Sequence, residues 1–299
     1  MYLTAPAVSN SAFRLHITTP SRPGRVPGVR MAGFHSRATD LSGFRFVAHP
    51  AVTLLIDLGD TLAVDEASGQ ALRGSIAAGL APGAVLRGRG RDIECLQVRL
   101  SPAVAHAVLG AFPELSGTVA AFDDLWGGDA ARLLERLRAS SSWEERFALA
   151  EAALGARLEA GRAVYPEVAF AWARMAASRG RVRVERLAAE TGWSRKRLWS
   201  RFRSQIGLTP KRAAELVRFD YAVHRLAAGH RPAVVAAESG YADQSHLHHE
   251  VVAFAGMTPS AVAATPWLSV DPVAWPSAGR GTFLQDTRRR AGDAGSHDR

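Results

Sequence analysis

The chain has 299 residues, 47% of them hydrophobic, and a formal net charge of +9 at neutral pH. This length and composition predict a globular protein of two domains and exclude a disordered chain. The single cysteine, Cys95, excludes a disulfide framework and a zinc site built on thiolates and suits a cytoplasmic protein, and no apolar run is long enough to cross a membrane.

The first 40 residues differ in composition from the rest of the chain. Residues 1–30 hold four arginines, no acidic residue and scattered prolines. A transit peptide has a similar composition, but no cleavable apolar core is visible in this segment. We therefore expect residues 1–40 to be a disordered or non-native extension, and an overlong reading frame whose translation starts at Met31 is the preferred explanation.

Residues 41–160 are predicted to form a β-rich domain that senses a ligand, dimerises, or does both. Short runs of strand-forming residues at 44–47, 52–58, 61–64 and 93–100 are separated by turn residues. They indicate a small antiparallel barrel or sandwich of about seven strands. Residues of the last run alternate in polarity, and we expect Cys95 to be buried there.

Helices are predicted after these strands. Ser101 stands before a proline, which suits the first turn of a helix. Asp129 can cap a second helix, and Ser142 with Glu145 has the spacing of a capping box. We expect these helices to pack on the β unit or against a second subunit, and one more helix between residues 161 and 180 to lead into the C-terminal domain.

A pattern is repeated between residues 184 and 259. Each copy contains a turn glycine, a leucine nine positions before a closing glycine, and a Thr-Pro pair at a fixed offset after that glycine. These residues are Gly192, Leu198, Gly207 and Thr209-Pro210 in the first copy, and Gly240, Leu247, Gly256 and Thr258-Pro259 in the second. Two tandem helix-turn-helix units joined by a long helix are the simplest interpretation.

Positive charge is concentrated around the first copy. Residues 181–231 contain 13 Lys or Arg against 4 Asp or Glu, and the rest of the chain is balanced with 24 of each. Phosphate contacts supply most of the sequence-independent affinity of a protein for nucleic acid. We therefore expect a nucleic-acid partner for this part of the chain.

The second helix of each unit carries the predicted DNA contacts. Because successive helical residues are rotated by about 100°, Leu198 and Phe202 share one face, which we expect to be buried. The opposite face offers cations and hydroxyl groups suited to base edges and phosphates. The predicted base contacts are Lys196, Arg197, Trp199 and Ser200 in the first unit and Gln244, Ser245, His246 and His249 in the second. The predicted phosphate contacts are Arg195, Arg201, Arg203, Lys211 and Arg212.

The two units differ in charge. The predicted second helix of the second unit contains histidines but no Lys or Arg. Histidines gain a proton in mildly acidic solution, so we expect acid to strengthen its binding to phosphates. The first unit is therefore predicted to anchor the protein, and the second to adjust the choice of site.

Four strings carry a family resemblance: LWSRFR at 198–203, GLTP at 207–210, GYADQSH at 240–246 and GMTP at 256–259. With these strings, residues 192–259 resemble the DNA-binding domain of AraC-family transcriptional regulators. The resemblance implies an all-α DNA-binding domain, which we place at residues 161–268, followed by a flexible tail at 269–299. The N-terminal part is more weakly similar to the cupin-like sensing domains of this family, so the expected fold class is α+β.

This resemblance implies a sequence-specific transcription regulator in the cytoplasm. Its expected partners are double-stranded DNA and RNA polymerase, and a small-molecule effector and a homodimer stay open. We expect no cofactor and no metal, because the spacing of His246, His248 and His249 on one helix is poor ligand geometry. We also expect no enzymatic activity. Two alternatives remain: an enzyme domain with an appended DNA-targeting module, and a constitutive regulator with a purely structural N-terminal domain.

Overall fold

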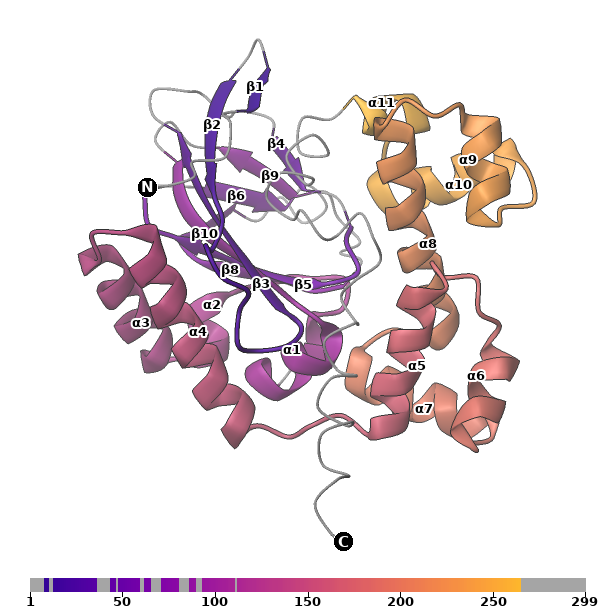
Figure 1. Ribbon diagram of the computed structural model, residues 1–299, viewed down its shortest axis with the longest axis horizontal. Helices are drawn as coiled ribbons and strands as arrows, with labels where there is room; N and C mark the ends of the chain where they lie inside the picture. Colours follow the sequence, from indigo (N-terminus) through magenta and orange to yellow (C-terminus); the bar gives the residue numbers. More distant parts are fainter. Residues whose placement is uncertain are drawn as a thin grey trace, which may run out of the picture.

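The computed structural model describes residues 8–10, 13–36, 44–46, 48–59, 62–65, 71–80, 86–89, 93–110 and 112–264. A β-rich half and a helical half lie side by side (Figure 1). The fold class is therefore α+β, as predicted. The tail expected at residues 269–299 lies outside the described residues.

Within the described ranges, eleven strands form two antiparallel sheets. The larger sheet has the order β1-β2-β3-β10-β5-β8-β11 and the smaller has the order β4-β9-β6-β7. The strands predicted at 44–47, 52–58, 61–64 and 93–100 correspond to β4, β5, β6 and β10. The strand bounds are β1 Val8–Asn10, β2 Phe13–Thr18, β3 Val29–Ser36, β4 Phe44–Phe46, β5 Val52–Asp57, β6 Leu62–Asp65, β7 Ala71–Arg73, β8 Ile76–Ala78, β9 Leu86–Arg89, β10 Ile93–Leu100 and β11 Val119–Ala121.

The N-terminal segment belongs to the larger sheet, and the prediction that residues 1–40 lie outside the fold is wrong for residues 8–10 and 13–36. Strand β3 pairs with β10 along its whole length, and β2 pairs with β3. Ile17, Met31 and Phe34 are buried in the sheet. Met31, the proposed translation start, lies inside β3.

The connection between β2 and β3 explains why the arginine-rich composition of this segment wrongly indicated a disordered extension. Arg22 and Arg25 lie in this connection, outside both strands. The backbone N–H of Arg25 donates to Glu151, and the backbone N–H of Ser21 donates to Glu144 over 2.9 Å. The arginine-rich segment is therefore held by acidic side chains of a helix far along the chain.

Helices follow the strands. The predicted cap Ser142 and the predicted helix start at Ser101-Pro102 are confirmed, and the hydroxyl oxygens of both serines accept from backbone N–H groups in the first turn. Asp129 was predicted to cap a helix, but Gly127 occupies that position, and Asp129 instead pairs with Arg157 over 2.6 Å. The bounds are α1 Pro102–Leu109, the 3-10 helix η1 Phe112–Leu115, α2 Phe122–Trp126, α3 Gly128–Ala139 and α4 Trp143–Ala160.

The first residue of helix α4, Trp143, packs against a glycine of the larger sheet. A Cβ atom at Gly33 in β3 would lie 2.4 Å from the ring of Trp143, so only glycine allows this contact. Cys95, in the neighbouring strand β10, is partly rather than fully buried, contrary to the prediction. Its removal from water raises the pKa of the thiol to about 12, with a further contribution from Asp57 and Glu94.

Seven helices make up the rest of the described chain. Helix α8 runs through this half and contacts α5, α7, α9, α10 and α11. Its buried side chains, including Leu216, Phe219 and Val223, form the centre of the packing. The bounds are α5 Pro166–Ala177, α6 Val184–Thr191, α7 Arg195–Ile206, α8 Pro210–Ala227, α9 Pro232–Ser239, α10 Gln244–Ala255 and α11 Pro259–Ala263.

Candidate DNA-binding surface

The predicted repeat forms two helix pairs of the same design. Helices α6 and α7 make the first unit, and α9 and α10 make the second. The turn glycines Gly192 and Gly240 have φ of +68° and +80°, values that L side chains rarely adopt. They end α6 and α9 and turn the chain into the second helix of each unit. We call α7 and α10 the reading helices.

The Thr-Pro pairs also have the same structure in both copies. Thr209 caps α8 and Thr258 caps α11, each accepting a backbone N–H with its hydroxyl oxygen, and a proline follows in the first turn. Helix α8 has 18 residues, which corresponds to roughly 27 Å at 1.5 Å per residue. It therefore separates the two units by a fixed helical span.

The face of α7 predicted to be buried is confirmed. Leu198, Phe202 and Ile206 have no exposed surface and pack against the rest of the domain. The opposite side is exposed, and Trp199 there keeps 45% of its surface accessible. Ser194 caps the helix at its start, and the burial of these three side chains sets its rotation. Together they determine which residues of α7 face outward. The predicted base contacts Lys196, Arg197, Trp199 and Ser200 are all among them.

Aromatic rings support several cations of the first unit. Arg197 lies 4.5 Å from the ring centroid of Trp193, and Arg203 lies 5.3 Å from that of Trp199. Arg201 stacks in the same way on Tyr165. A stacked guanidinium keeps its in-plane N–H groups available for other acceptors. These contacts position the cations on the surface of α7.

The other predicted phosphate contacts have acidic neighbours. Arg195 lies 3.4 Å from Glu185, and Lys211 lies 3.9 Å from Glu215. Arg212 donates to Glu215 and covers the ring of Phe254 at 3.8 Å, so it also joins α8 to α10. Arg212 is only partly exposed, whereas the other predicted phosphate contacts are exposed.

The second reading helix has the predicted orientation but a different surface. Leu247 and Val251 are fully buried, while Gln244, Ser245, His246 and His249 are exposed. The helix is capped by Asp243, which accepts from the backbone N–H of His246 over 2.7 Å. It therefore presents amide, hydroxyl and imidazole groups where α7 presents cations.

His246 is held by neighbouring groups. Its Nδ1 lies 3.4 Å from the backbone N–H of Ala242, and its Nε2 lies 3.9 Å from the carboxylate of Glu250. The imidazole also meets the ring of Tyr241 edge-on, with 5.2 Å between centroids. The Nδ1 atom of this predicted base contact therefore accepts from the protein itself, whereas Nε2 lies beyond hydrogen-bond distance of Glu250.

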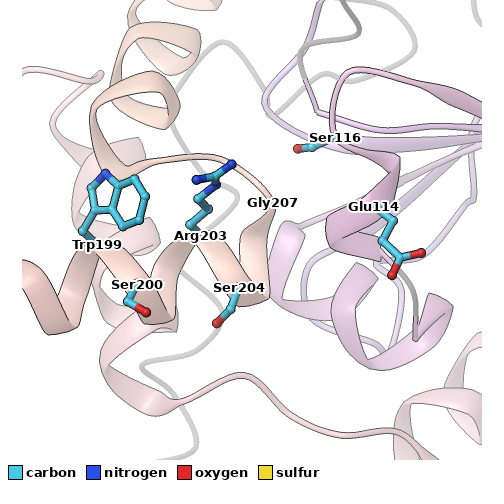
Figure 2. A pocket seen from close by; sticks show the side chains of 7 residues that line it. All are labelled: Glu114, Ser116, Trp199, Ser200, Arg203, Ser204 and Gly207. Atoms are coloured by element: carbon cyan, nitrogen blue, oxygen red, sulfur yellow. The ribbon is translucent and has the colours of Figure 1, made fainter.

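A cleft of about 500 Å³ lies between α7 and the β-rich half. Its α7 side is formed by Trp199, Ser200, Arg203 and Ser204, and Glu114 and Ser116 from the segment at η1 form the other side (Figure 2). The C-terminal half of the predicted reading face therefore faces the β-rich half. The sequence contains no signal for this neighbour, because residues 114 and 203 are far apart in the chain.

Two other classes of site have no support among the described residues. In the part of the chain that the structure describes, no three His, Cys, Asp or Glu side chains cluster closely enough to hold a metal ion. Among the described helices, none is both long and apolar enough to cross a membrane.

Comparisons with known proteins agree with the repeat. A family model described as a helix-turn-helix domain matches residues 187–265. The uncharacterized HTH-type transcriptional regulator YbfI of Bacillus subtilis (strain 168) is 39% identical over 61 residues, which span 20% of this chain and 22% of that protein.

The solved structures that match this chain share little sequence identity with it. ToxT from Vibrio cholerae O395 is 10% identical, with a TM-score of 0.45, and the match covers 79% of this chain and 97% of ToxT. The AraC-like transcriptional activator CuxR is 14% identical, with a TM-score of 0.32, and the match covers 68% of this chain and 80% of CuxR. Together, the matched family model and the aligned regulator identify residues 187–265 as a helix-turn-helix domain, and the strings at 198–210 and 240–259 resemble those of AraC-family transcriptional regulators.

Proposed function

We propose that this protein is a sequence-specific transcription regulator that reads two successive major grooves of double-stranded DNA. In this proposal α7 enters one groove and α10 enters the next, so that a single chain binds two half-sites. The DNA-binding domain comprises residues 161–268, and the protein works in the cytoplasm with RNA polymerase as a further partner.

The observation that carries the proposal is the repetition of one helix pair on both ends of α8. Successive major grooves on one face of DNA are about 34 Å apart. A helix of 18 residues spans roughly 27 Å, so two units at its ends reach both grooves if the DNA bends slightly toward the protein. A domain with only a structural role has no need of two exposed reading helices at this spacing.

The reading helices have different roles in the proposal. Lys196, Arg197, Trp199 and Ser200 contact bases in the first half-site, and Gln244, Ser245, His246 and His249 contact bases in the second. Arg195, Arg201, Arg203 and Lys211 hold phosphates, and Arg212 holds a phosphate from its position beside Phe254. The first unit contributes most of the affinity, because the exposed cations are concentrated there.

The β-rich half regulates this binding in our proposal, through a small-molecule effector or through dimerisation. Its position supports this role, since the segment at η1 borders the reading face of α7. A change in the β-rich half that moves this segment alters the access of DNA to α7.

Selection of bound sites from random DNA tests the proposal. The full chain is expected to enrich a site with two short sequence blocks centred about one helical turn apart. Scrambling either block should weaken binding, and scrambling the first block should weaken it more. Enrichment of no sequence, with equal binding to all DNA, would contradict sequence-specific recognition.

A further inference from the structure

We propose that Glu250 is a positioning residue for the second half-site, because its buried carboxylate fixes the second reading helix against α8 and orients His246 at the DNA surface. The inference rests on the proposed function and extends it to a residue that does not touch DNA.

Glu250 lies on the buried side of α10 with only 9% of its surface exposed. Arg218 of α8 forms a two-pronged contact with it: its Nε donates to Oε1 over 3.2 Å, and a terminal N–H donates to Oε2. The hydroxyl of Tyr241 donates to Oε1 over 2.7 Å. Both carboxylate oxygens therefore accept from donors outside α10.

These three side chains come from different elements. Arg218 belongs to α8, Tyr241 to the turn after α9, and Glu250 to the reading helix α10. The guanidinium of Arg218 also lies 4.6 Å from the ring centroid of Tyr241. Because two-pronged contacts and stacking each require a defined angle, the network sets the rotation of α10 as well as its distance from α8.

Burial makes the network sensitive to the loss of one member. An ionised side chain left without its partner in a buried place has a large solvation penalty. Burial, and then the neighbouring carboxylate of Glu250, raise the pKa of Tyr241, so its hydroxyl stays protonated as a donor. The helix therefore relaxes to another position if Glu250 loses its charge or its acceptors.

The network continues to the DNA surface through His246. Its Nε2 lies 3.9 Å from Oε2 of Glu250, and its ring meets that of Tyr241 edge-on. Side chains that touch bases must be held within a fraction of an ångström, and neighbours of this kind supply that order. Loss of Glu250 thus affects the position of α10 and the orientation of one of its base contacts together.

The first unit has no equivalent of this carboxylate. Counting from the repeated leucine, the residue that corresponds to Glu250 is Arg201, which is exposed and stacks on Tyr165. Counting from the turn glycines Gly192 and Gly240, Tyr241 corresponds to Trp193, over which Arg197 lies. The first unit therefore keeps cations on its surface at these positions, whereas the second has a buried ion pair. A defect in the network is expected to affect one half-site only.

The test compares three full-length variants on DNA sites selected by the natural chain. Glu250→Gln removes the charge and one acceptor, and Tyr241→Phe removes only one hydroxyl and leaves the ring in place. Glu238→Gln is the matched control, because Glu238 also pairs with an arginine of α8, over 2.7 Å, but on the non-reading helix α9 and with 41% of its side chain exposed. For each variant, affinity is measured for the intact site and for sites scrambled in the first or second block.

We expect Glu250→Gln to lose about tenfold or more of the discrimination between intact and second-block-scrambled DNA, and Tyr241→Phe to lose about threefold. In both variants, the discrimination between intact and first-block-scrambled DNA should stay within about twofold of the value for the natural chain. Glu238→Gln should match the natural chain in both blocks. The dependence of affinity on salt concentration should not change, because no phosphate contact is removed. If circular dichroism shows that Glu250→Gln does not fold, the second-block discrimination of Tyr241→Phe tests the inference instead.

Three outcomes would overturn the inference and leave the proposed function intact. The first is unchanged second-block discrimination in Tyr241→Phe and Glu250→Gln, and the second is an equal loss in both blocks. An equal effect of Glu238→Gln also overturns it, because any ion pair of α8 would then suffice. If the natural chain discriminates neither block, the proposed function fails and the inference fails with it.

Discussion

Glu114, in the short helix η1 of the β-rich half, lines the same cleft as Arg203 on the first reading helix (Figure 2). Glu114 is exposed, so its charge faces the solvent beside the surface that we propose for DNA. Phosphates that approach α7 would meet a carboxylate next to the cations that attract them. At moderate ionic strength, charges interact over about 10 Å, so the carboxylate weakens binding without touching DNA.

Replacing Glu114 with Gln should therefore strengthen DNA binding. We expect about a twofold to fivefold gain in affinity at low salt, which declines as salt screens the charge. The measurement is a titration of labelled DNA at several salt concentrations. Glu135→Gln is the control, because Glu135 is an exposed acid on α3, on the other side of the β-rich half from α7 in Figure 1. Equal gains in both variants would mean that only the net charge matters.

The helical half was predicted closely because its signals are local. Gly192 and Gly240 mark the turns, and the Thr-Pro pairs mark helix starts, so each element depends on a few neighbouring residues. The N-terminal strands were missed because the arginines near them dominate the composition, whereas β3 depends on pairing with β10, about 60 residues later. The cleft was missed for the same reason, since no local pattern relates Glu114 to Arg203.

The buried ion pair of the second unit shows the same limit. Spacing on a helix predicted Leu247 and Val251 as buried, and both are. It did not predict that Glu250, a charged residue beside them, is buried too, because its partner Arg218 lies on another helix. Periodicity identifies apolar faces, but it does not identify a charge whose burial is compensated from a distance.

Gly180 is predicted to be essential for the packing of α5 on α8. It has φ of +73°, and a Cβ atom there would lie 2.1 Å from the carbonyl oxygen of Ala214. Gly229 has a similar φ of +85° with nothing within 4 Å of such an atom. We expect Gly229→Ala to cost about 1 to 2 kcal/mol from the backbone alone. Gly180→Ala should cost about 1 to 3 kcal/mol more, because α8 must shift.

Urea unfolding of both variants measures this difference. Since the backbone penalty is shared, the comparison isolates the contact with α8. Equal unfolding free energies for the two variants would show that the helices can separate slightly at no cost.

His106 on α1 is predicted to make the protein less stable in acid. Burial lowers the pKa of His106, although a contact with the backbone of Gln205 in α7 opposes this shift. The unfolded chain then takes up the proton more readily than the folded one, so the stabilising contribution of neutral His106 is complete above its unfolded pKa of about 6.5. It is lost as the pH falls through the lower folded pKa.

Thermal unfolding between pH 8 and pH 5 checks this sign. The melting temperature of the natural chain should fall more across this range than that of His106→Gln. The glutamine keeps a polar side chain but has no proton to gain. His248→Gln serves as the control, because His248 is exposed on α10. If the melting temperature of His106→Gln falls as steeply as that of the natural chain, His106 is not the cause of the lower stability in acid.

Cys95 is predicted to react slowly in the folded protein. Burial, together with Asp57 and Glu94, raises the pKa of its thiol from 9.0 to about 12. At pH 8 the fraction of reactive thiolate falls from about one in ten to about one in ten thousand, so labelling should be about a thousandfold slower than in the unfolded chain. A chromogenic disulfide reagent measures both rates, and the single cysteine makes the signal unambiguous. Similar rates in buffer and in denaturing urea would mean that β10 opens readily at its pairing with β3 and β5.

Lys196 and Arg203 should have different effects on DNA binding, although both are cations on the exposed side of α7. Lys196 lies in the first turn, where a reading helix meets base edges, so Lys196→Ala should relax preference at one or two base pairs by about 1 to 3 kcal/mol. Arg203 lies two turns later and stacks on Trp199, so we expect it to hold a phosphate. Arg203→Ala should weaken binding to all sequences alike and lower the salt slope by about one. Affinities for selected and random DNA at several salt concentrations separate these effects, and equal losses on both kinds of DNA for both variants would contradict the division of roles.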